Sequence, residues 1–190
     1  SGYGPDGPYK DLPGHDINYL SFGGVQELIG EADRLPAIPL NLVADYAGAT
    51  MHTVIGILLA LMARERTGRG QQVDIAYLDG VIALLAATPD FWPFFRDGIK
   101  PRRGLSPLGG AYPYYGVYEC QDGKLITLGC LEPWFWERMC KALGREDLAS
   151  FRFTPSHFVE GPDEKTQEVV GYLREVFKTK TRDAWFDFLL

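Results

Sequence analysis

Three features of the 190-residue sequence predict a mixed fold of helices and strands, of the α/β or α+β class. Residues 45–67 carry a long helical pattern of apolar residues, residues 114–129 carry a hairpin pattern, and further helical patterns follow residue 133. Apolar residues make up 46% and aromatic residues 13% of the chain, which allows a substantial core and excludes a disordered chain.

Residues 1–40 are rich in glycine and proline and predict loops, with a short helix or an extended segment at 17–22. The helix expected over 45–67 has apolar residues on one side and small residues on the other, so we expect it to be buried on most sides. Cationic residues close this helix and Gly68 stops it, as is typical of helix C-termini.

The middle of the chain predicts one strand, one helix and one long loop. Residues 72–76 alternate like a short strand, and residues 78–88 have the pattern of an apolar helix. Residues 89–113 predict a long loop, and loops of this length often carry function. This loop holds a basic cluster, either solvated or in contact with a phosphate, at Lys100, Arg102 and Arg103.

A hairpin and three helices are expected in the last part of the chain. Asp122-Gly123 is a strong turn signal between strands at 114–120 and 124–129. Pro133 starts a helix that Gly144 stops. The two helices that follow are predicted over 163–179 and from 181 onward.

Two domains are therefore expected. Residues 1–106 form part of a large domain with the long linking helix, and residues 107–190 form a small hairpin-and-helix domain. The sequence begins at Ser1 without methionine and ends at Asp187–Leu190 inside an apolar helical pattern. We therefore expect these residues to be a piece of a longer protein, with the small domain cut short at its C-terminal side.

Charge and composition exclude several classes of function. The net charge of −6 is unlike that of proteins that bind the nucleic acid backbone. The longest unbroken apolar run, residues 54–63, is too short to span a bilayer, so no membrane is expected. Three cysteines, an odd number without a C-x-x-C pair, indicate neither a disulfide framework nor a zinc site and favour a cytoplasmic compartment.

Four polar residues are candidates for chemistry, and each has a plainer interpretation. His15 is either a general base or an exposed capping histidine. Asp45 stabilises a helix N-terminus or stands beside a developing oxyanion, where Asn41 one turn earlier would suit the same site. Glu132 precedes Pro133, so capping alone explains it.

Three other motifs give little information about function. The glycines at positions 2, 4 and 7 match a dinucleotide fingerprint formally, but no strand precedes them, so a turn is expected. His52 lies inside the apolar helix and is expected to be a satisfied core histidine. His157 lies in a predicted loop and indicates nothing specific.

Five ordered motifs resemble one family, the family III CoA-transferases of the CaiB/BaiF type, and within it the α-methylacyl-CoA racemases. The motifs are Ser1–Tyr9 with its repeated glycines and prolines, Gly14-His-Asp-Ile-Asn-Tyr19, Asn41-Leu-Val-Ala-Asp45, Gly110–Tyr118 with Asp122-Gly123, and Gly129-Cys-Leu-Glu-Pro133. The resemblance implies an α/β fold with a Rossmann-like large domain and a smaller domain, of which this chain is a fragment. It also implies an interlocked homodimer.

The resemblance to the racemase branch assigns roles to individual residues. His15 and Asp45 would be the two catalytic acid/base groups, and Glu132 would orient His15. The residues that would bind the acyl-CoA substrate are Gly14, Asp16, Ile17, Asn18, Tyr19, Asn41 and Tyr115. Backbone N–H groups at the start of the Asp45 helix would hold the enolate oxygen between the two groups.

This resemblance implies inversion of the α-carbon of a 2-methyl-branched acyl-CoA by proton transfer through an enolate. No metal or redox cofactor is implied, and coenzyme A enters as part of the substrate. One alternative is a CoA-transferase, in which Asp45 forms an anhydride and then an enzyme thioester. The other alternative is a non-catalytic fragment of such an enzyme.

Overall fold

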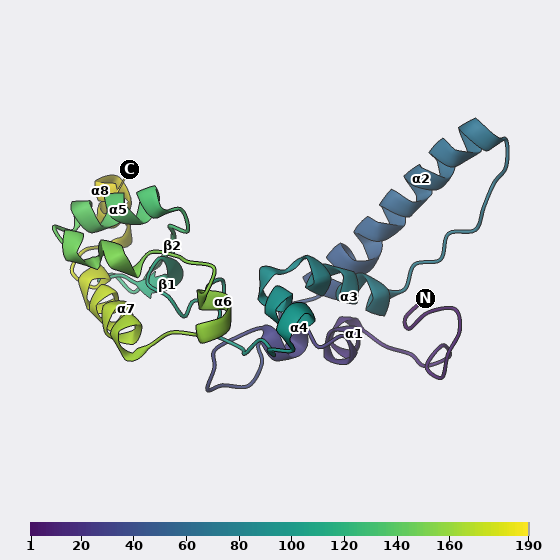
Figure 1. The fold of residues 1–190 in the computed structure, drawn as a ribbon. Helices are drawn as coiled ribbons and strands as arrows, with labels where there is room; N and C mark the ends of the chain where they lie inside the picture. The colour runs from purple at the N-terminus through teal and green to yellow at the C-terminus, as the bar shows by residue number, and fades with distance from the viewer. Residues whose placement is uncertain (190) are drawn as a thin grey trace. The chain divides into compact units, whose positions relative to one another are not determined.

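The computed structural model describes residues 1–189 of the chain (Figure 1). These residues form two compact units, Ser1–Gly98 and the part from Ile99 onward. The division falls eight residues before the expected boundary at 106. Leu190, the last residue of the predicted terminal helix, lies outside the described residues.

The first unit is built from helices and connecting loops. They are α1 (Asp16–Phe22), η1 (Gln26–Leu28), η2 (Leu42–Met51), α2 (His52–Thr67), α3 (Tyr77–Ala87), η3 (Pro89–Phe91) and α4 (Trp92–Asp97). The alternatives for 17–22 are resolved in favour of a helix, α1. The core of this unit lies where α1, η2 and α3 meet, and its buried members are Tyr19, Leu20, Val25, Ala44, Val81 and Leu85.

The long helix is confirmed, and it begins three residues before the expected start at 45. Its first segment, η2, is a ten-residue π-helix, a rare form that is frequently found at functional sites. The second segment, α2, ends at Gly68, which adopts a left-handed conformation with φ of 69°.

The expectation that the long helix is buried on most sides is wrong for α2, which has no buried residue. It extends past α1 and α3 with apolar side chains exposed, among them Leu58 at 55% and Leu59 at 59% (Figure 1). Over Leu42–Thr67 the helix is long and apolar enough to cross a membrane, by length and composition alone. The bent pair Tyr77–Ala87 and Pro89–Asp97 passes the same test if it is counted as one span.

The strand expected at 72–76 is wrong. This segment is extended but has no partner strand among residues 1–189, and the carbonyl of Ile75 accepts a hydrogen bond from the Ser1 amino group at 2.9 Å. Val73 lies over Gly56 of α2, where an added Cβ would come within 2.8 Å of its Cγ1 atom. The alternating pattern therefore reflects packing against a helix instead of pairing in a sheet.

The helix expected over 78–88 is confirmed as α3, but the loop expected over 89–113 is partly helical. Pro89 and Pro93 each lie in the first turn of a short helix, a position that suits proline because no intrahelical N–H bond is needed there. Phe91 packs against the core of the unit and meets Phe94 edge-on, with ring centroids 5.8 Å apart.

The second unit contains the predicted hairpin and helices. Strands β1 (Tyr115–Glu119) and β2 (Leu125–Gly129) pair antiparallel, with Val117 opposite Thr127. The helices are α5 (Pro133–Ala142), η4 (Glu146–Phe151), α6 (His157–Glu160), α7 (Glu164–Phe177) and α8 (Arg182–Leu189). The hairpin, α5, α7 and α8 were expected, whereas η4 and α6 were not.

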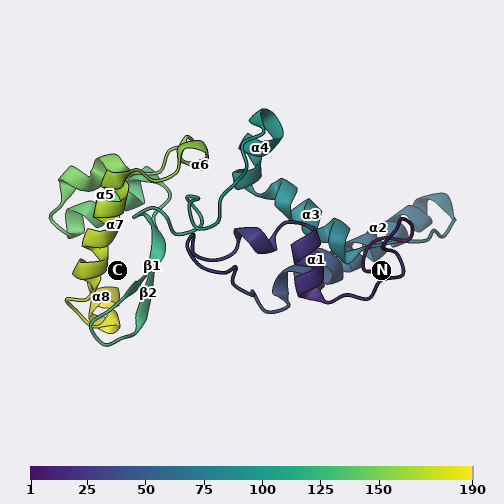
Figure 2. The same cartoon turned by 90° about the horizontal axis from the view of Figure 1, so that it is seen from below.

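The core of the second unit is aromatic. Helix α7 lies beside the hairpin in both views (Figure 1, Figure 2) and packs against β1. Phe177 of α7 stacks on Tyr118 of β1 with ring centroids 4.8 Å apart. Two buried tryptophans donate to backbone carbonyls, Trp136 to Leu148 at 3.0 Å and Trp185 to Phe177 at 2.8 Å. Because their N–H groups are satisfied, these large side chains are buried without an unpaired donor.

Candidate active site

His15 lies at the start of α1, with its side chain exposed. Its backbone is held on both sides of the turn. The His15 N–H donates to Asn18 Oδ1 at 2.9 Å, and the His15 carbonyl accepts from the Asn18 N–H at 2.8 Å. The Asn18 side chain, expected to bind substrate, therefore fixes the residue that carries the candidate base.

Tyr19 holds the backbone of Gly14, the residue that directly precedes His15. Its hydroxyl donates to the Gly14 carbonyl at 2.8 Å, and its ring stacks on Tyr77 with centroids 4.8 Å apart. A Cβ on Gly14 would come within 2.8 Å of the Tyr19 ring, so only glycine fits this close approach. Burial raises the pKa of Tyr19, and the charges of Tyr3, Tyr77 and Asp45 add to the rise.

Asp45 lies in the first turn of η2 and is half-buried. Asn41 donates from Nδ2 to Asp45 Oδ2 at 3.3 Å, so the pair expected to share a site is in contact. The Asp45 carbonyl accepts from the Thr50 hydroxyl at 2.8 Å, an additional bond within the wide turn of the π-helix. The carboxyl group is therefore contacted by Asn41, and the backbone that carries it is bonded within η2.

Asp16 joins the two parts of the site. This residue is 5% exposed, and its Oδ2 atom accepts from the N–H groups of Ala44 at 2.8 Å and Asp45 at 2.9 Å. The expectation that N–H groups at the start of the Asp45 helix hold an enolate oxygen is therefore wrong for these two, because Asp16 already occupies them.

Of the three remaining candidates, one lies on α1 and two lie in the second unit. Ile17 is 40% exposed on α1, two residues after His15 in the sequence. Glu132 and Tyr115 belong to the second unit, and their part in the site remains a prediction. Glu132 is exposed at the start of α5 and makes no side-chain cap, so capping alone does not explain it. Tyr115 is half-buried in β1 opposite Gly129.

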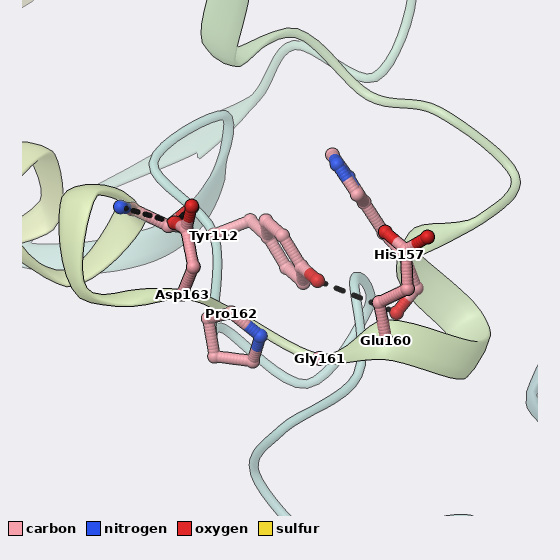
Figure 3. Close-up of a pocket in the computed structure, with 7 residues that line it drawn as sticks. Tyr112, His157, Glu160, Gly161, Pro162 and Asp163 are labelled. Carbon is pink, nitrogen blue, oxygen red and sulfur yellow. Dashed lines mark hydrogen bonds between the residues drawn. The ribbon is translucent and has the colours of Figure 1, made fainter.

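The sequence did not indicate a polar pocket of about 250 Å³ in the second unit (Figure 3). The His157 ring stacks on Tyr112 with centroids 4.3 Å apart, and His157 Nδ1 lies 3.0 Å from the Tyr114 hydroxyl. In Figure 3 the Tyr112 ring lies between His157 and Glu160 on one side and Asp163 on the other. The residues that meet here lie more than forty positions apart, and no local pattern signals such a contact.

The ionisation of the pocket residues follows from their burial. Burial lowers the pKa of His157, although Glu160 and Asp163 act in the opposite direction. Burial also raises the pKa of Tyr112 to about 12. The pocket therefore favours a neutral imidazole and a neutral phenol. Within residues 1–189, neither this pocket nor any other place gathers three His, Cys, Asp or Glu side chains that could hold a metal ion.

Solved structures identify the fold class. The chain superimposes over its whole length on a CaiB/BaiF family protein from Brucella suis, with a TM-score of 0.74 and 27% identity, and it covers 48% of that chain. The predicted fold class, a fragment of the family III fold, is thereby confirmed.

The model of CoA-transferase family III matches residues 1–190, and the chain belongs to this family. It is similar to the alpha-methylacyl-CoA racemase of Mus musculus, at 35% identity over 97% of this chain and 46% of that protein. It is also similar to the beta subunit of a succinyl-CoA–L-malate CoA-transferase of Chloroflexus aurantiacus, at 34% identity over 79% of this chain and 36% of that protein. The chain thus spans less than half the length of these relatives, which include both racemases and transferases.

Proposed function

We propose that the chain is part of an acyl-CoA racemase or epimerase that inverts the α-carbon of 2-methyl-branched acyl-CoA thioesters. The observation that carries this proposal is the bond that the Asp45 N–H donates to Asp16 Oδ2, which joins the helix that begins after His15 to the helix that carries Asp45. The likeness to proteins named as alpha-methylacyl-CoA racemases supports the same reaction.

In the proposed reaction the α-carbon loses one proton and receives another on its opposite face. The neutral His15 imidazole takes the α-proton on one face, which leaves an enolate, and a protonated Asp45 delivers a proton to the other face. In the reverse direction a charged Asp45 accepts and a protonated His15 donates. The enolate oxygen needs hydrogen-bond donors other than the occupied N–H groups of Ala44 and Asp45. Glu132 is proposed to orient His15, and Ile17 and Tyr115 to contact the substrate.

Deuterium incorporation tests this proposal. A protein expressed from the complete reading frame that contains these residues is incubated with a 2-methylacyl-CoA in heavy water. We expect deuterium at the α-carbon in the wild type and its loss in His15→Ala and Asp45→Asn. The matched control is His52→Asn. In the wild type His52 Nδ1 lies 3.1 Å from the Ala47 carbonyl, and the asparagine keeps a donor for that carbonyl. Full exchange by His15→Ala would refute the role of His15.

The second candidate is transfer of CoA between carboxylic acids, which the similarity to the Chloroflexus transferase favours. In this chemistry Asp45 attacks the thioester carbonyl, the CoA thiolate leaves, and a mixed anhydride forms. The thiolate then attacks the Asp45 carbonyl, releasing the first acid and leaving an enzyme thioester. An acceptor acid repeats the sequence in reverse. Trapping Asp45 as a hydroxamate during turnover, without α-deuteration, would favour this candidate over the racemase.

We also propose that the complete protein works as an interlocked homodimer in the cytoplasm. Val54, Leu58 and Met62 form one stripe along α2, and each is more than 50% exposed, which supports cover by a second copy. Light scattering after gel filtration tests this: Leu58→Glu should give monomers or aggregates, whereas Leu35→Glu, at a loop residue 90% exposed, should stay dimeric. A monomeric wild type, or its recovery in the membrane fraction, would contradict the proposal.

A further inference from the structure

Asp16 is unusual among the carboxylates of the chain because it is buried. Among residues 1–189 the buried polar or charged side chains are Asp16, at 5% exposure, and Thr166, at 7%. Asp16 Oδ2 accepts a hydrogen bond from the N–H group of Ala44, which lies 28 residues later in the sequence. A buried charge of this kind persists only when strong hydrogen bonds offset its desolvation.

The partners of Asp16 are the amide groups that a helix leaves unpaired at its N-terminus. The N–H groups in the first turn of a helix lack intrahelical partners, and a negative charge there is favoured by the helix dipole. Asp16 supplies both an acceptor and a charge to η2 from the neighbouring helix α1. Its other oxygen, Oδ1, is buried and has no hydrogen-bond partner among the described residues. The contact between Asp16 and η2 therefore depends on Oδ2.

We propose that Asp16 is a positioning residue, whose carboxylate holds the first turn of η2 and thereby the Asp45 carboxyl relative to His15. This inference rests on the proposed function for its kinetic consequence. It differs from the substrate-binding role that the family resemblance implies, because a buried carboxylate that already accepts two backbone bonds is not free to bind an acyl-CoA.

The loss of this carboxylate would disturb both catalytic groups. Without Asp16 Oδ2 the Ala44 and Asp45 amides lose their acceptor, and the turn that carries the Asn41–Asp45 bond is released. Because His15 directly precedes Asp16 in the chain, the same bonds also join the start of α1, which carries His15, to η2. A shift of about 1 Å in a reacting group can lower a rate about 100-fold.

Two variants separate positioning from substrate binding. Asp16→Asn keeps an oxygen acceptor in place of Oδ2, whereas Asp16→Ala removes it. We expect kcat for α-deuteration to fall about 100-fold in Asp16→Ala with KM unchanged, and the Asp16→Asn variant to recover part of that loss. Asp163→Ala is the matched control: it removes an aspartate that accepts from the Thr166 N–H at 2.8 Å in the other unit, and kcat should not change.

Hydrogen exchange gives a readout that does not need activity. We expect the Ala44 and Asp45 amides to exchange about 10- to 100-fold faster in Asp16→Ala, as the loss of a charge-assisted bond implies. Unchanged exchange at these amides would overturn the proposal even if the wild type is active. A raised KM with unchanged kcat would also overturn it, since Asp16 would then bind substrate.

If the wild type catalyses neither deuteration nor transfer, the proposed function fails, while the exchange rates still decide whether Asp16 holds η2. Should Asp16→Ala fail to fold, the same two measurements on Asp16→Asn decide the matter.

Discussion

Replacing Gly80 by alanine tests the packing that supports the Asp45 helix. Gly80 of α3 is buried against Gly48 of η2, where the two backbones touch. A Cβ on Gly80 would lie 2.5 Å from the Gly48 carbonyl carbon and 2.8 Å from its Cα. Real Cβ atoms essentially never approach other atoms this closely, and a backbone cannot rotate aside as a flexible side chain can.

The expected loss of stability follows from two opposing terms. Overpacking of a core costs about 1–3 kcal/mol, and contact with backbone lies at the upper end of that range. Alanine is favoured over glycine inside a helix by about 1 kcal/mol, which offsets part of the cost. The net loss is therefore about 2 kcal/mol. For a unit of 98 residues this lowers the melting temperature by about 8–16 °C.

Thermal unfolding followed by circular dichroism measures the effect. Gly171→Ala is the matched control, because Gly171 also lies in a helix, α7, but has no heavy atom within 4 Å of its added Cβ. This control should gain about 1 kcal/mol of stability from helix propensity. Equal stability of Gly80→Ala and the wild type, or shifts of the same sign in both variants, would refute the proposed close packing of α3 on η2.

Three further predictions concern single side chains. Asn41→Ala removes the donor to Asp45 and should lower kcat about 3- to 10-fold, as the loss of one hydrogen bond implies; an unchanged rate in the deuteration assay would contradict this. Because burial lowers the pKa of His157, the unfolded chain binds the proton more readily, so stability should decline as the pH falls below about 6.5. Urea midpoints at several pH values measure this decline, which His157→Asn should reduce. Trp136→Phe leaves the buried Leu148 carbonyl without its donor and should destabilise the second unit by about 1–3 kcal/mol in urea unfolding, whereas exposed Trp134→Phe should have little effect.

Local signals predicted most of the helices and the hairpin. Three of these signals act on their immediate neighbours, and each marks an element that the structure contains. They are the turn at Asp122-Gly123, the proline at 133 and the glycine at 68. The strand at 72–76 failed because alternation reports two different environments and not the presence of a partner strand. A helix surface at Gly56 provides that environment here.

The site was only partly predictable for the same reason. Asn41 and Asp45 lie one helical turn apart, so their contact follows from spacing. The bond from Asp16 to the start of η2 joins two helices that are distant in sequence, and the π-helical form of η2 has no pattern of its own. The stacking of Tyr112 on His157 likewise depends on how the second unit folds.

A structure of the complete protein with a bound, unreactive 2-methylacyl-CoA analogue tests the central claim most directly. The measurement is the position of the His15 imidazole and the Asp45 carboxylate relative to the α-carbon. We predict that the two groups lie on opposite faces of that carbon, with the nearest nitrogen or oxygen of each within about 3–3.5 Å of it. Both groups on one face, or separated by protein from the thioester, would contradict inversion by two bases.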